Sequence, residues 1–379
     1  MNYFKILRFL QLGDRGAFDV PVEQQRAFLE SLGEAKNDID RGYKQYLCQN
    51  FFVPQWKVWL LNIVAAVVVP FIVLFFLLKR CFVREEQHVD TMMEHKDMDE
   101  VVPTIVWEKY NPTEKYWKQG ASMSFNDFSF LIRLVSRAPH HPYFILKSWM
   151  NVVLYSDMIR RHSPEVMIQF GEFSFSSSIL TAYCHRHGVK HIDIMHGEKL
   201  WFIRDAFFHY DECYVWDEYY AELFRDLKAE PNQFRVALPT SMHFTIETYQ
   251  NQNYYADYKY YLALYTEEQI KEIVHSMKFA RSNGKTVKYR PHPRYSDVEL
   301  LRKYVSEEEI EQPKDVDILC SVSNLDYAVG SYTTVLSQAY FSGKNVVLDN
   351  VTYKSQYDKL KELKYILSST NPILLSDCQ

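Results

Sequence analysis

Short apolar runs and amphipathic stretches alternate along the chain from about residue 160. The run at 166–170 (VMIQF) predicts a strand, the segment 175–187 predicts a helix that Gly188 ends, and the run at 190–195 (KHIDIM) predicts a second strand. A strand, a helix and a strand in this order form the repeating unit of a parallel sheet. Another strand is expected at 214–216, followed by a further helix.

The same alternation returns after a connector rich in Tyr and Asn at 248–260. Capping boxes, which mark helix starts, are expected from Thr266 with Gln269 and from Ser296 with Glu299. The strands expected here are 261–264, 286–290, 327–329 and 345–348. Two series of this kind predict an α/β chain with two Rossmann-like domains that face a cleft.

A long uncharged segment precedes both series. Residues 58–78 (VWLLNIVAAVVVPFIVLFFLL) contain Asn62 as their one strongly polar residue, and as a helix they would be about 31 Å long, close to the thickness of a bilayer core. The basic residues that follow directly are Lys79, Arg80 and Arg84, so the positive-inside rule predicts a cytoplasmic location for the rest of the chain. A re-entrant hairpin at Pro70 and a buried core helix are the alternatives.

The residues before this segment are expected to be helical and close to the membrane. Residues 3–12 (YFKILRFLQL) have the composition of a short helix that lies on a membrane surface. A plain amphipathic helix that packs on the body of the protein is the alternative for this N-terminal region. The predicted organisation is a helical segment at 1–56, a transmembrane or re-entrant helix at 57–80, a linker at 81–103, a Rossmann-like acceptor domain at 104–250 and a Rossmann-like nucleotide-donor domain at 258–379.

Composition and charge narrow the possible partners. The 379 residues are 47% hydrophobic and 24% charged, with a net charge of −5. A nucleic-acid binder would normally be basic, so nucleic acid is not an expected partner. The six cysteines form no Cys-x-x-Cys pair, which favours unpaired thiols in a reducing compartment over zinc sites or disulfides.

The stretch KYRPHPRYS, residues 288–296, is the first expected site. Its two prolines fix the backbone as it leaves the sheet, and ligands bind beyond the carboxyl ends of parallel strands. A histidine held there can donate a hydrogen bond to a phosphate and stabilise it as a leaving group. The candidate donor-binding residues are Arg290, His292, Pro293 and Arg294.

The stretch GSYTT, residues 330–334, is the second expected site. It follows a predicted strand and opens a predicted helix, where free backbone N–H groups and hydroxyls bind anions. Ser331, Thr333 and Thr334 are therefore candidates for holding a phosphate. Ordinary helix capping by Thr333 or Thr334 is the alternative.

The third expected site is the sequence Met195-His196-Gly197-Glu198, at the end of the strand 190–195. His196 is the candidate general base for an acceptor hydroxyl, and Glu198 could act in its place or orient it. Glu172, after the neighbouring strand, is a second candidate carboxylate. No metal-ligand set and no cofactor are expected, since the pair Asp315 and Asp317 is interpreted as structural.

These motifs together resemble those of bacterial GT-B glycosyltransferases that use cytidylyl-activated donors. The bacterial sialyl- and polysialyltransferases carry a His-Pro motif and a Ser/Thr motif for the CMP part of the donor, as His292-Pro293 and Ser331 to Thr334 do here. The CDP-glycerol glycerophosphotransferases of teichoic acid synthesis carry a His-Gly and a His-Pro, and the stretch MHGEKLWF is similar to theirs. The resemblance covers roughly residues 160–350.

The resemblance implies a GT-B glycosyltransferase of surface polysaccharide synthesis, such as capsule or lipopolysaccharide, anchored at the cytoplasmic membrane with its catalytic domain in the cytoplasm. Its partners would be a nucleotide-activated sugar donor, CMP-linked as in the resembling enzymes, and a glycan or lipid-linked glycan acceptor, and transfer would be inverting without a metal. Sialyltransferases of this type have an acidic-acidic-Gly triplet where the base lies, whereas this chain has Met195-His196-Gly197 there and Cys213 after Asp211-Glu212. That departure does not favour a sialic acid donor.

Three other functions are compatible with the same motifs. The first is a CDP-glycerol-type glycerophosphotransferase, which moves a phosphoryl group. The second is a nucleotide-sugar epimerase of the same shape, which would need no lipid acceptor. The third is a non-catalytic polysaccharide-assembly protein.

Overall fold

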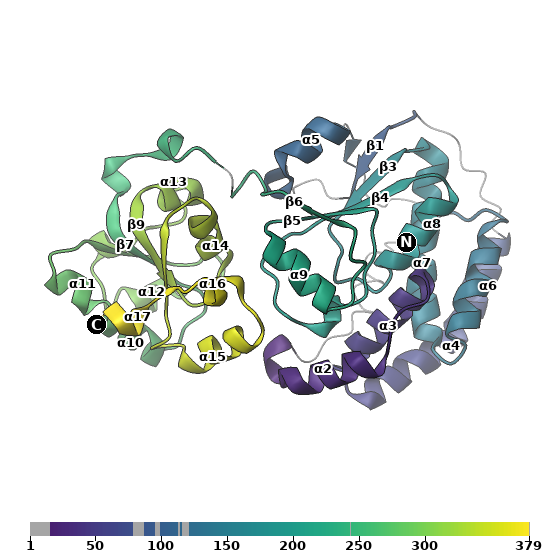
Figure 1. The fold of residues 1–379 in the computed structure, drawn as a ribbon, viewed down its shortest axis with the longest axis horizontal. Helices are drawn as coiled ribbons and strands as arrows, with labels where there is room; N and C mark the ends of the chain where they lie inside the picture. The colour runs from purple at the N-terminus through teal and green to yellow at the C-terminus, as the bar shows by residue number, and fades with distance from the viewer. Residues whose placement is uncertain are drawn as a thin grey trace. The chain divides into compact units, whose positions relative to one another are not determined.

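The computed structural model describes residues 16–78, 87–94, 99–112, 114–115, 121–242 and 244–378 (Figure 1). The predicted surface helix at 3–12 and the basic residues Lys79, Arg80 and Arg84 lie outside these ranges. The chain forms two compact units. The first comprises Met1–His196 with Trp201–Leu238, and the second comprises Gly197–Leu200 with Pro239–Gln379.

A six-stranded sheet with parallel pairing and the order β2-β1-β3-β4-β5-β6 forms the centre of the first unit. Its strands are β1 (Thr91–Met93), β2 (Glu114–Lys115), β3 (Val166–Gln169), β4 (Lys190–Ile194), β5 (Glu212–Val215) and β6 (Phe234–Val236). β1 lies within the predicted linker at 81–103 and pairs with β3. A strand of three residues is too short to leave a periodic pattern in the sequence.

Helices cover both faces of this sheet. They are α2 (Val22–Ser31), α3 (Asp38–Asn50), α4 (Gln55–Leu78), α5 (Thr104–Tyr110), α6 (Asp127–Arg137), α7 (Pro142–His162), α8 (Ser177–Arg186) and α9 (Glu218–Asp226), with short 3-10 helices η1 (Ala17–Asp19), η2 (Asp99–Val101) and η3 (Ile203–Asp205). Successive residues of a strand point to opposite faces. Met167 accordingly packs with the cluster of α7 and α8, and Ile168 packs with the cluster that includes Val106 of α5.

The N-terminal helices belong to the body of the first unit. Tyr46 of α3 is fully buried in the same cluster as α7 and α8, and its ring meets Phe175 edge-on at 5.2 Å. The predicted boundaries at 57, 81 and 104 therefore fall inside one compact unit.

The predicted membrane segment is a single long helix, α4. It is apolar and long enough to cross a membrane, with a mean hydropathy of 2.7 over an 18-residue stretch within Gln55–Phe76. It continues through Pro70 without a break, so the described helix contains no hairpin.

The second unit is centred on a five-stranded sheet with parallel pairing and the order β11-β10-β9-β7-β8. Its strands are β7 (Ala256–Tyr261), β8 (Val287–Arg290), β9 (Leu325–Gly330), β10 (Asn345–Leu348) and β11 (Ile373–Leu374). Its helices are η4 (Ile246–Tyr249), η5 (Gln252–Tyr254), α10 (Glu267–Ser276), α11 (Lys278–Ser282), α12 (Val298–Leu301), η6 (Glu307–Glu309), α13 (Ile318–Ser323), α14 (Thr334–Phe341), α15 (Lys354–Glu362), α16 (Ile366–Ser369) and α17 (Leu375–Cys378).

Two local predictions for this unit were wrong. The strand expected at 261–264 is β7, which ends at Tyr261 and occupies part of the supposed connector; tyrosine suits a half-buried pleated surface despite its hydroxyl. Ser296 is not the cap of the following helix, because Asp297 caps α12 by accepting from the Leu300 N–H. The hydroxyl of Ser296 is instead engaged with the loop of His292.

The predicted α/β class, with two Rossmann-like domains preceded by helices that include a long apolar one, is confirmed. In the second unit the order of the strands also creates a switch point. The chain passes from β7 to β8 on one side and from β9 to β10 on the other, although β7 and β9 are neighbours. Ligands of open parallel sheets bind beyond the carboxyl ends of the strands at such a point.

Candidate functional site

A cavity of about 270 Å³ lies at the switch point of the second sheet. Its lining residues come from the ends of β7 and β9 and from the start of α15: Tyr260, Tyr261, Ala263, Leu264, Ser331, Tyr332, Tyr353 and Gln356. Tyrosine rings offer flat apolar faces with polar edges, and Ser331 contributes a hydroxyl that donates to Gln356 Oε1 at 2.9 Å. The cavity can therefore accept a flat ring next to a polar group.

The loop of His292 is tied to the edge of this cavity. The Ser296 hydroxyl accepts from the His292 backbone N–H at 2.8 Å and donates to the carbonyl of the cavity-lining Ala263 at 2.7 Å. The imidazole of His292 stacks on Tyr295 at 4.5 Å, and its Nδ1 accepts from the Arg294 backbone N–H at 3.1 Å. These contacts orient the ring and leave Nε2 as its donor atom.

His292 is less basic than an ordinary histidine. Partial burial and the positive charge of Arg294 lower the pKa of His292 below its usual value of 6.5. The ring is thus neutral at pH 7, with a proton available to donate. An anion bound beside His292 would act in the opposite direction to burial and Arg294 and raise the pKa, because negative charge favours the protonated form.

The other predicted donor-binding residues differ in their surroundings. Pro293 and Arg294 are exposed at the same loop. Arg290 is buried, and its guanidinium donates to Glu311 at 2.8 Å and to the Val316 carbonyl at 2.8 Å. These contacts fix the end of β8 on the rest of the unit.

The three candidate residues of the second predicted motif also differ in their surroundings. Ser331 lines the cavity, as does Tyr332 beside it. Thr333 is the N-cap of α14, since its hydroxyl accepts from the Val335 N–H at 3.4 Å, and Thr334 is the first residue of that helix. Capping and anion binding use the same end of the helix, so both interpretations of this motif remain open to test.

In the first unit, His196 lies beside a buried carboxylate. The Nδ1 atom of His196 is 3.8 Å from Oε2 of Glu172, whose side chain is fully buried, while about a third of the His196 side chain is exposed. Phe170 and Phe173 present ring edges to the imidazole at 6.1 and 5.8 Å. Glu172 follows β3 and His196 follows β4, so the pair stands at the carboxyl edge of the first sheet.

The loop that carries Glu172 is fixed by its neighbours. Asp193 of β4 is buried and accepts from the Gly171 N–H at 2.8 Å, which holds the loop as it leaves β3. Gln45 of α3 donates to the Glu172 carbonyl at 2.8 Å. The backbone that carries Glu172 is therefore held by both the sheet and an N-terminal helix, a relation that no local motif in the sequence indicated.

Glu198 belongs to the second unit by its contacts. Its carboxylate accepts from the Ser337 hydroxyl on α14 at 2.5 Å. Of the two predicted carboxylates, Glu172 is thus the one that the structure places beside His196, and Glu198 is engaged with the helix that Thr333 caps.

The acidic pair Asp211-Glu212 lies at the opposite edge of the first sheet. Glu212 begins β5 and binds Lys109 at 2.9 Å, Lys190 at 2.8 Å and Tyr110 at 2.6 Å. Burial alone would raise the pKa of Glu212, but these hydrogen bonds lower it to about 2. The pair serves to fasten α5 and β4 and does not take part in the site at the carboxyl edge.

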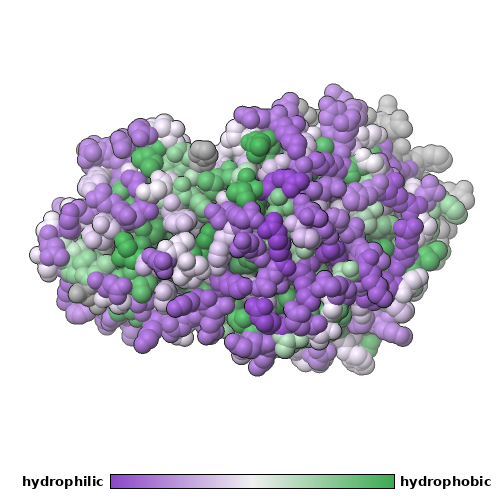
Figure 2. Space-filling view, in the orientation of Figure 1, coloured by the Kyte–Doolittle hydropathy of each residue, from purple (hydrophilic) through white to green (hydrophobic). Residues whose placement is uncertain are grey.

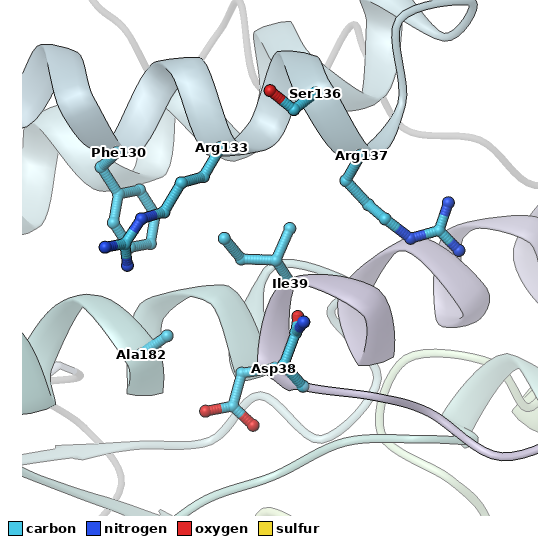
Figure 3. A pocket seen from close by; sticks show the side chains of 8 residues that line it. Asp38, Ile39, Phe130, Arg133, Ser136, Arg137 and Ala182 are labelled. Carbon is cyan, nitrogen blue, oxygen red and sulfur yellow. The ribbon is translucent and has the colours of Figure 1, made fainter.

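A larger cavity, of about 590 Å³, lies between α6 and the start of α3 (Figure 3). Figure 3 shows Arg133 and Arg137 of α6 on one side and Asp38 on the other, with the apolar Ile39 between them. Arg137 is paired with Asp40, and Asp38 with His209 at 2.6 Å. Its lining holds no residue from a strand end, so we assign it no chemistry.

No cluster of side chains suited to a metal ion is present in the part of the chain that the structure describes. Among those residues there is no group of three or more His, Cys, Asp and Glu side chains that could hold an ion.

Comparisons with known proteins give a distant likeness in structure. No family model and no curated protein sequence matches the chain. Among solved structures, a variant of the wall teichoic acid polymerase TagF is similar with 10% identity, 76% of each chain covered and a TM-score of 0.42. MnaA of S. aureus with UDP is similar with 11% identity, 75% of this chain and 91% of MnaA covered, and a TM-score of 0.43.

A third match is the lipopolysaccharide outer core galactosyltransferase WaaB, with 12% identity, 69% of this chain and 80% of WaaB covered, and a TM-score of 0.40. Scores below 0.5 at such identities carry no residue role and no substrate over to this chain. The chain is an α/β protein of two Rossmann-like domains with a distant structural likeness to GT-B enzymes.

Proposed function

We propose that this protein is a glycosyltransferase that moves a sugar from a nucleotide-activated donor, CMP-linked by the resemblance of its motifs, to a glycan acceptor in surface polysaccharide synthesis. The observation that carries the proposal is the cavity at the switch point of the second sheet, with the His292 loop tied to its edge. A nucleotide fits the chemistry of that place, since aromatic rings suit a base and Ser331 and His292 suit a phosphate.

The acceptor half of the reaction is assigned to the first unit. His196 takes the proton of the acceptor hydroxyl, and Glu172 stabilises the imidazolium that forms, at the 3.8 Å separation of the two side chains. The acceptor oxygen bonds to the anomeric carbon, and the bond from that carbon to the phosphate oxygen breaks. Attack from the face opposite the leaving group inverts the configuration.

The donor half is assigned to the second unit. The departing nucleotide carries the negative charge that the bond cleavage leaves behind. The Nε2 proton of His292 and the backbone N–H groups in the first turn of α14 are donors fixed before the reaction, and fixed donors aimed at developing charge are a main source of catalysis.

Nucleotide binding to the full chain in detergent tests the donor site. Calorimetry with CMP, CDP, UDP and GDP should show tightest binding for the cytidylyl nucleotides. His292→Ala should weaken that binding about tenfold or more, as loss of a hydrogen bond to a charged group does. The variant Tyr340→Ala, at an exposed side chain near the C-terminal end of α14, is the control and should bind as the wild type does. If none of the four nucleotides binds, the proposal is refuted.

Phosphoryl transfer from CDP-glycerol is the second candidate function, because the same motifs resemble those of glycerophosphotransferases. Product analysis separates the two. A polyol-phosphate product formed from CDP-glycerol, with none formed from CMP-sugars, would replace the glycosyltransferase assignment.

A further inference from the structure

Helix α4 is apolar on two opposite faces. Its inner stripe packs against the core cluster that contains α7: Leu61, Ala65, Val68, Val69, Ile72, Val73 and Phe76. Its outer stripe is exposed and follows the same helical spacing: Trp56, Trp59, Leu60, Ile63, Val64, Val67, Phe71, Leu74 and Phe75. The helix therefore belongs to the first unit by one face and presents a continuous apolar stripe with the other.

A helix on the surface of a soluble protein has a polar outer face. The outer stripe of α4 instead has side chains such as Trp59 and Phe71 that are each 68% exposed. On the face drawn in Figure 2, hydrophilic residues predominate and hydrophobic ones form smaller groups. Contiguous exposed apolar surface marks a face that another apolar phase covers.

The ends of the helix identify that phase as a lipid bilayer. Trp56 and Trp59 lie in the first turns beside Lys57, and the sequence after Leu78 continues with Lys79 and Arg80. Aromatic and basic residues at both ends of an uncharged stretch complement the interface and the anionic headgroups of a membrane. A protein partner would require a polar rim around the stripe, whereas residues 58–78 carry no charge.

The packing of the inner stripe restricts the orientation that α4 can take relative to the bilayer. The Asn62 side chain accepts from the Tyr143 N–H at 3.2 Å, which satisfies a free donor at the start of α7. Packing of the inner stripe then continues as far as Phe76. α7 itself carries Asp157, Arg160 and Arg161 and is buried in the unit, so it cannot enter lipid with α4.

We propose that α4 lies in the plane of one leaflet, with its outer stripe in the lipid and its inner stripe on the protein. At 24 residues it is about 36 Å long, so the contact is a long hydrophobic strip parallel to the membrane surface. This arrangement differs from the spanning and re-entrant helices expected from the sequence. It does not rest on the proposed reaction.

Photocrosslinking from neighbouring positions on the two stripes tests the proposal. The full chain is reconstituted in vesicles of equimolar phosphatidylglycerol and phosphatidylethanolamine, with a diazirine amino acid in place of Phe71 or, as the matched control, Ile72. Lipid adducts are expected from position 71, and protein-internal adducts from position 72. Lipid adducts from both positions would mean a helix surrounded by lipid and would overturn the proposal.

Adducts from position 71 to a second copy of the chain, or to no lipid at all, would overturn it as well. A flotation assay gives an independent readout on intact protein. Val67→Glu combined with Phe71→Glu should lower the vesicle-bound fraction about tenfold or more. Ile105→Glu, at an exposed apolar side chain of α5, should float as the wild type does, and equal flotation of all three proteins would contradict the in-plane contact.

Discussion

The two histidines that the sequence singled out are set in opposite electrostatic surroundings. His196 lies 3.8 Å from the buried carboxylate of Glu172, whereas His292 is next to the positive charge of Arg294. A carboxylate favours a histidine that accepts a proton, and a cation favours one that stays neutral and donates. This difference supports the assignment of a base role to His196 and a donor role to His292.

Glu172→Gln tests the pairing with His196. The amide keeps the size of the side chain but cannot stabilise the imidazolium that forms during proton transfer, so kcat should fall about 10- to 100-fold with little change in donor affinity. Glu198→Gln is the matched control, because Glu198 contacts Ser337, and its kcat should change much less. A larger kcat loss in the control than in Glu172→Gln would reverse the assignment.

The pH dependence of nucleotide binding tests His292. Because the pKa of His292 is lowered in the free protein, the ring gains a proton only as the pH falls below about 6.5. Bound phosphate favours that proton, so affinity should rise as the pH is lowered through this range. His292→Gln should leave only the titration of the phosphate itself, and an unchanged pH profile in this variant would exclude a contact with the phosphate.

Among the secondary-structure elements, the attachment of α5 to the sheet depends on Glu212. The carboxylate stands at the start of β5 and binds Lys109 and Tyr110 of α5 together with Lys190 of β4. These bonds lower the pKa of Glu212 from its ordinary 4.5 to about 2. A carboxyl with a depressed pKa stabilises the fold above its unfolded pKa, and the contribution is lost as the pH falls through the folded value.

Glu212→Gln should therefore lower the free energy of unfolding by about 1–3 kcal/mol at neutral pH. The difference between wild type and variant should narrow as the pH is lowered from about 6 to about 3, because the wild-type carboxylate is then protonated in the unfolded state. Urea unfolding followed by circular dichroism measures both effects. A difference that stays constant across this range would show that Glu212 acts through packing and not through charge.

At the level of the whole molecule, the N-terminal helices complete the first unit. Tyr46 of α3 is buried among residues of α7 and α8, and Gln45 holds the loop of Glu172. The helices are thus part of the scaffold of the candidate base, and removal of residues 1–56 would take away core side chains.

Tyr46→Ala should destabilise the first unit by about 3–5 kcal/mol, as truncation of a large core side chain does. Trp56→Ala, at a side chain that is 67% exposed, should change stability in detergent by less than about 0.5 kcal/mol. Hydrogen exchange should locate the loss in the first unit, with β7 and β9 protected as in the wild type. Equal stability of both variants would show that α3 is dispensable for the fold.

Much of the α/β order was predictable because strands and helices leave local periodic signals. β3, β4, β8 and β10 were found within about a residue of their observed ends, since each is a short apolar or alternating run near turn residues. β1 was missed because its pairing with β3 is a non-local property. β7 was displaced because its tyrosines resemble a polar connector in sequence although they are half-buried or buried in the sheet.

The motifs stand at the ends of strands as predicted, but the surroundings of each residue within them were not a sequence property. Arg290 and His292 are two residues apart, yet the first is committed to Glu311 and the second lies at the edge of a cavity. β8 ends at Arg290, so only Arg290 is buried as part of the strand, while His292 lies in the loop that follows. How deeply each is buried depends on the elements that pack around the strand end.

The sequence by itself determined the fold class, the motifs at the strand ends and the length of the apolar helix, because each rests on short-range patterns of polarity and backbone preference. The tertiary structure decided which carboxylate stands beside His196, which hydroxyl lines the cavity and which face of α4 remains open. These are contacts between segments distant in the chain. Their formation depends on the packing of whole elements, which no local stretch of residues encodes.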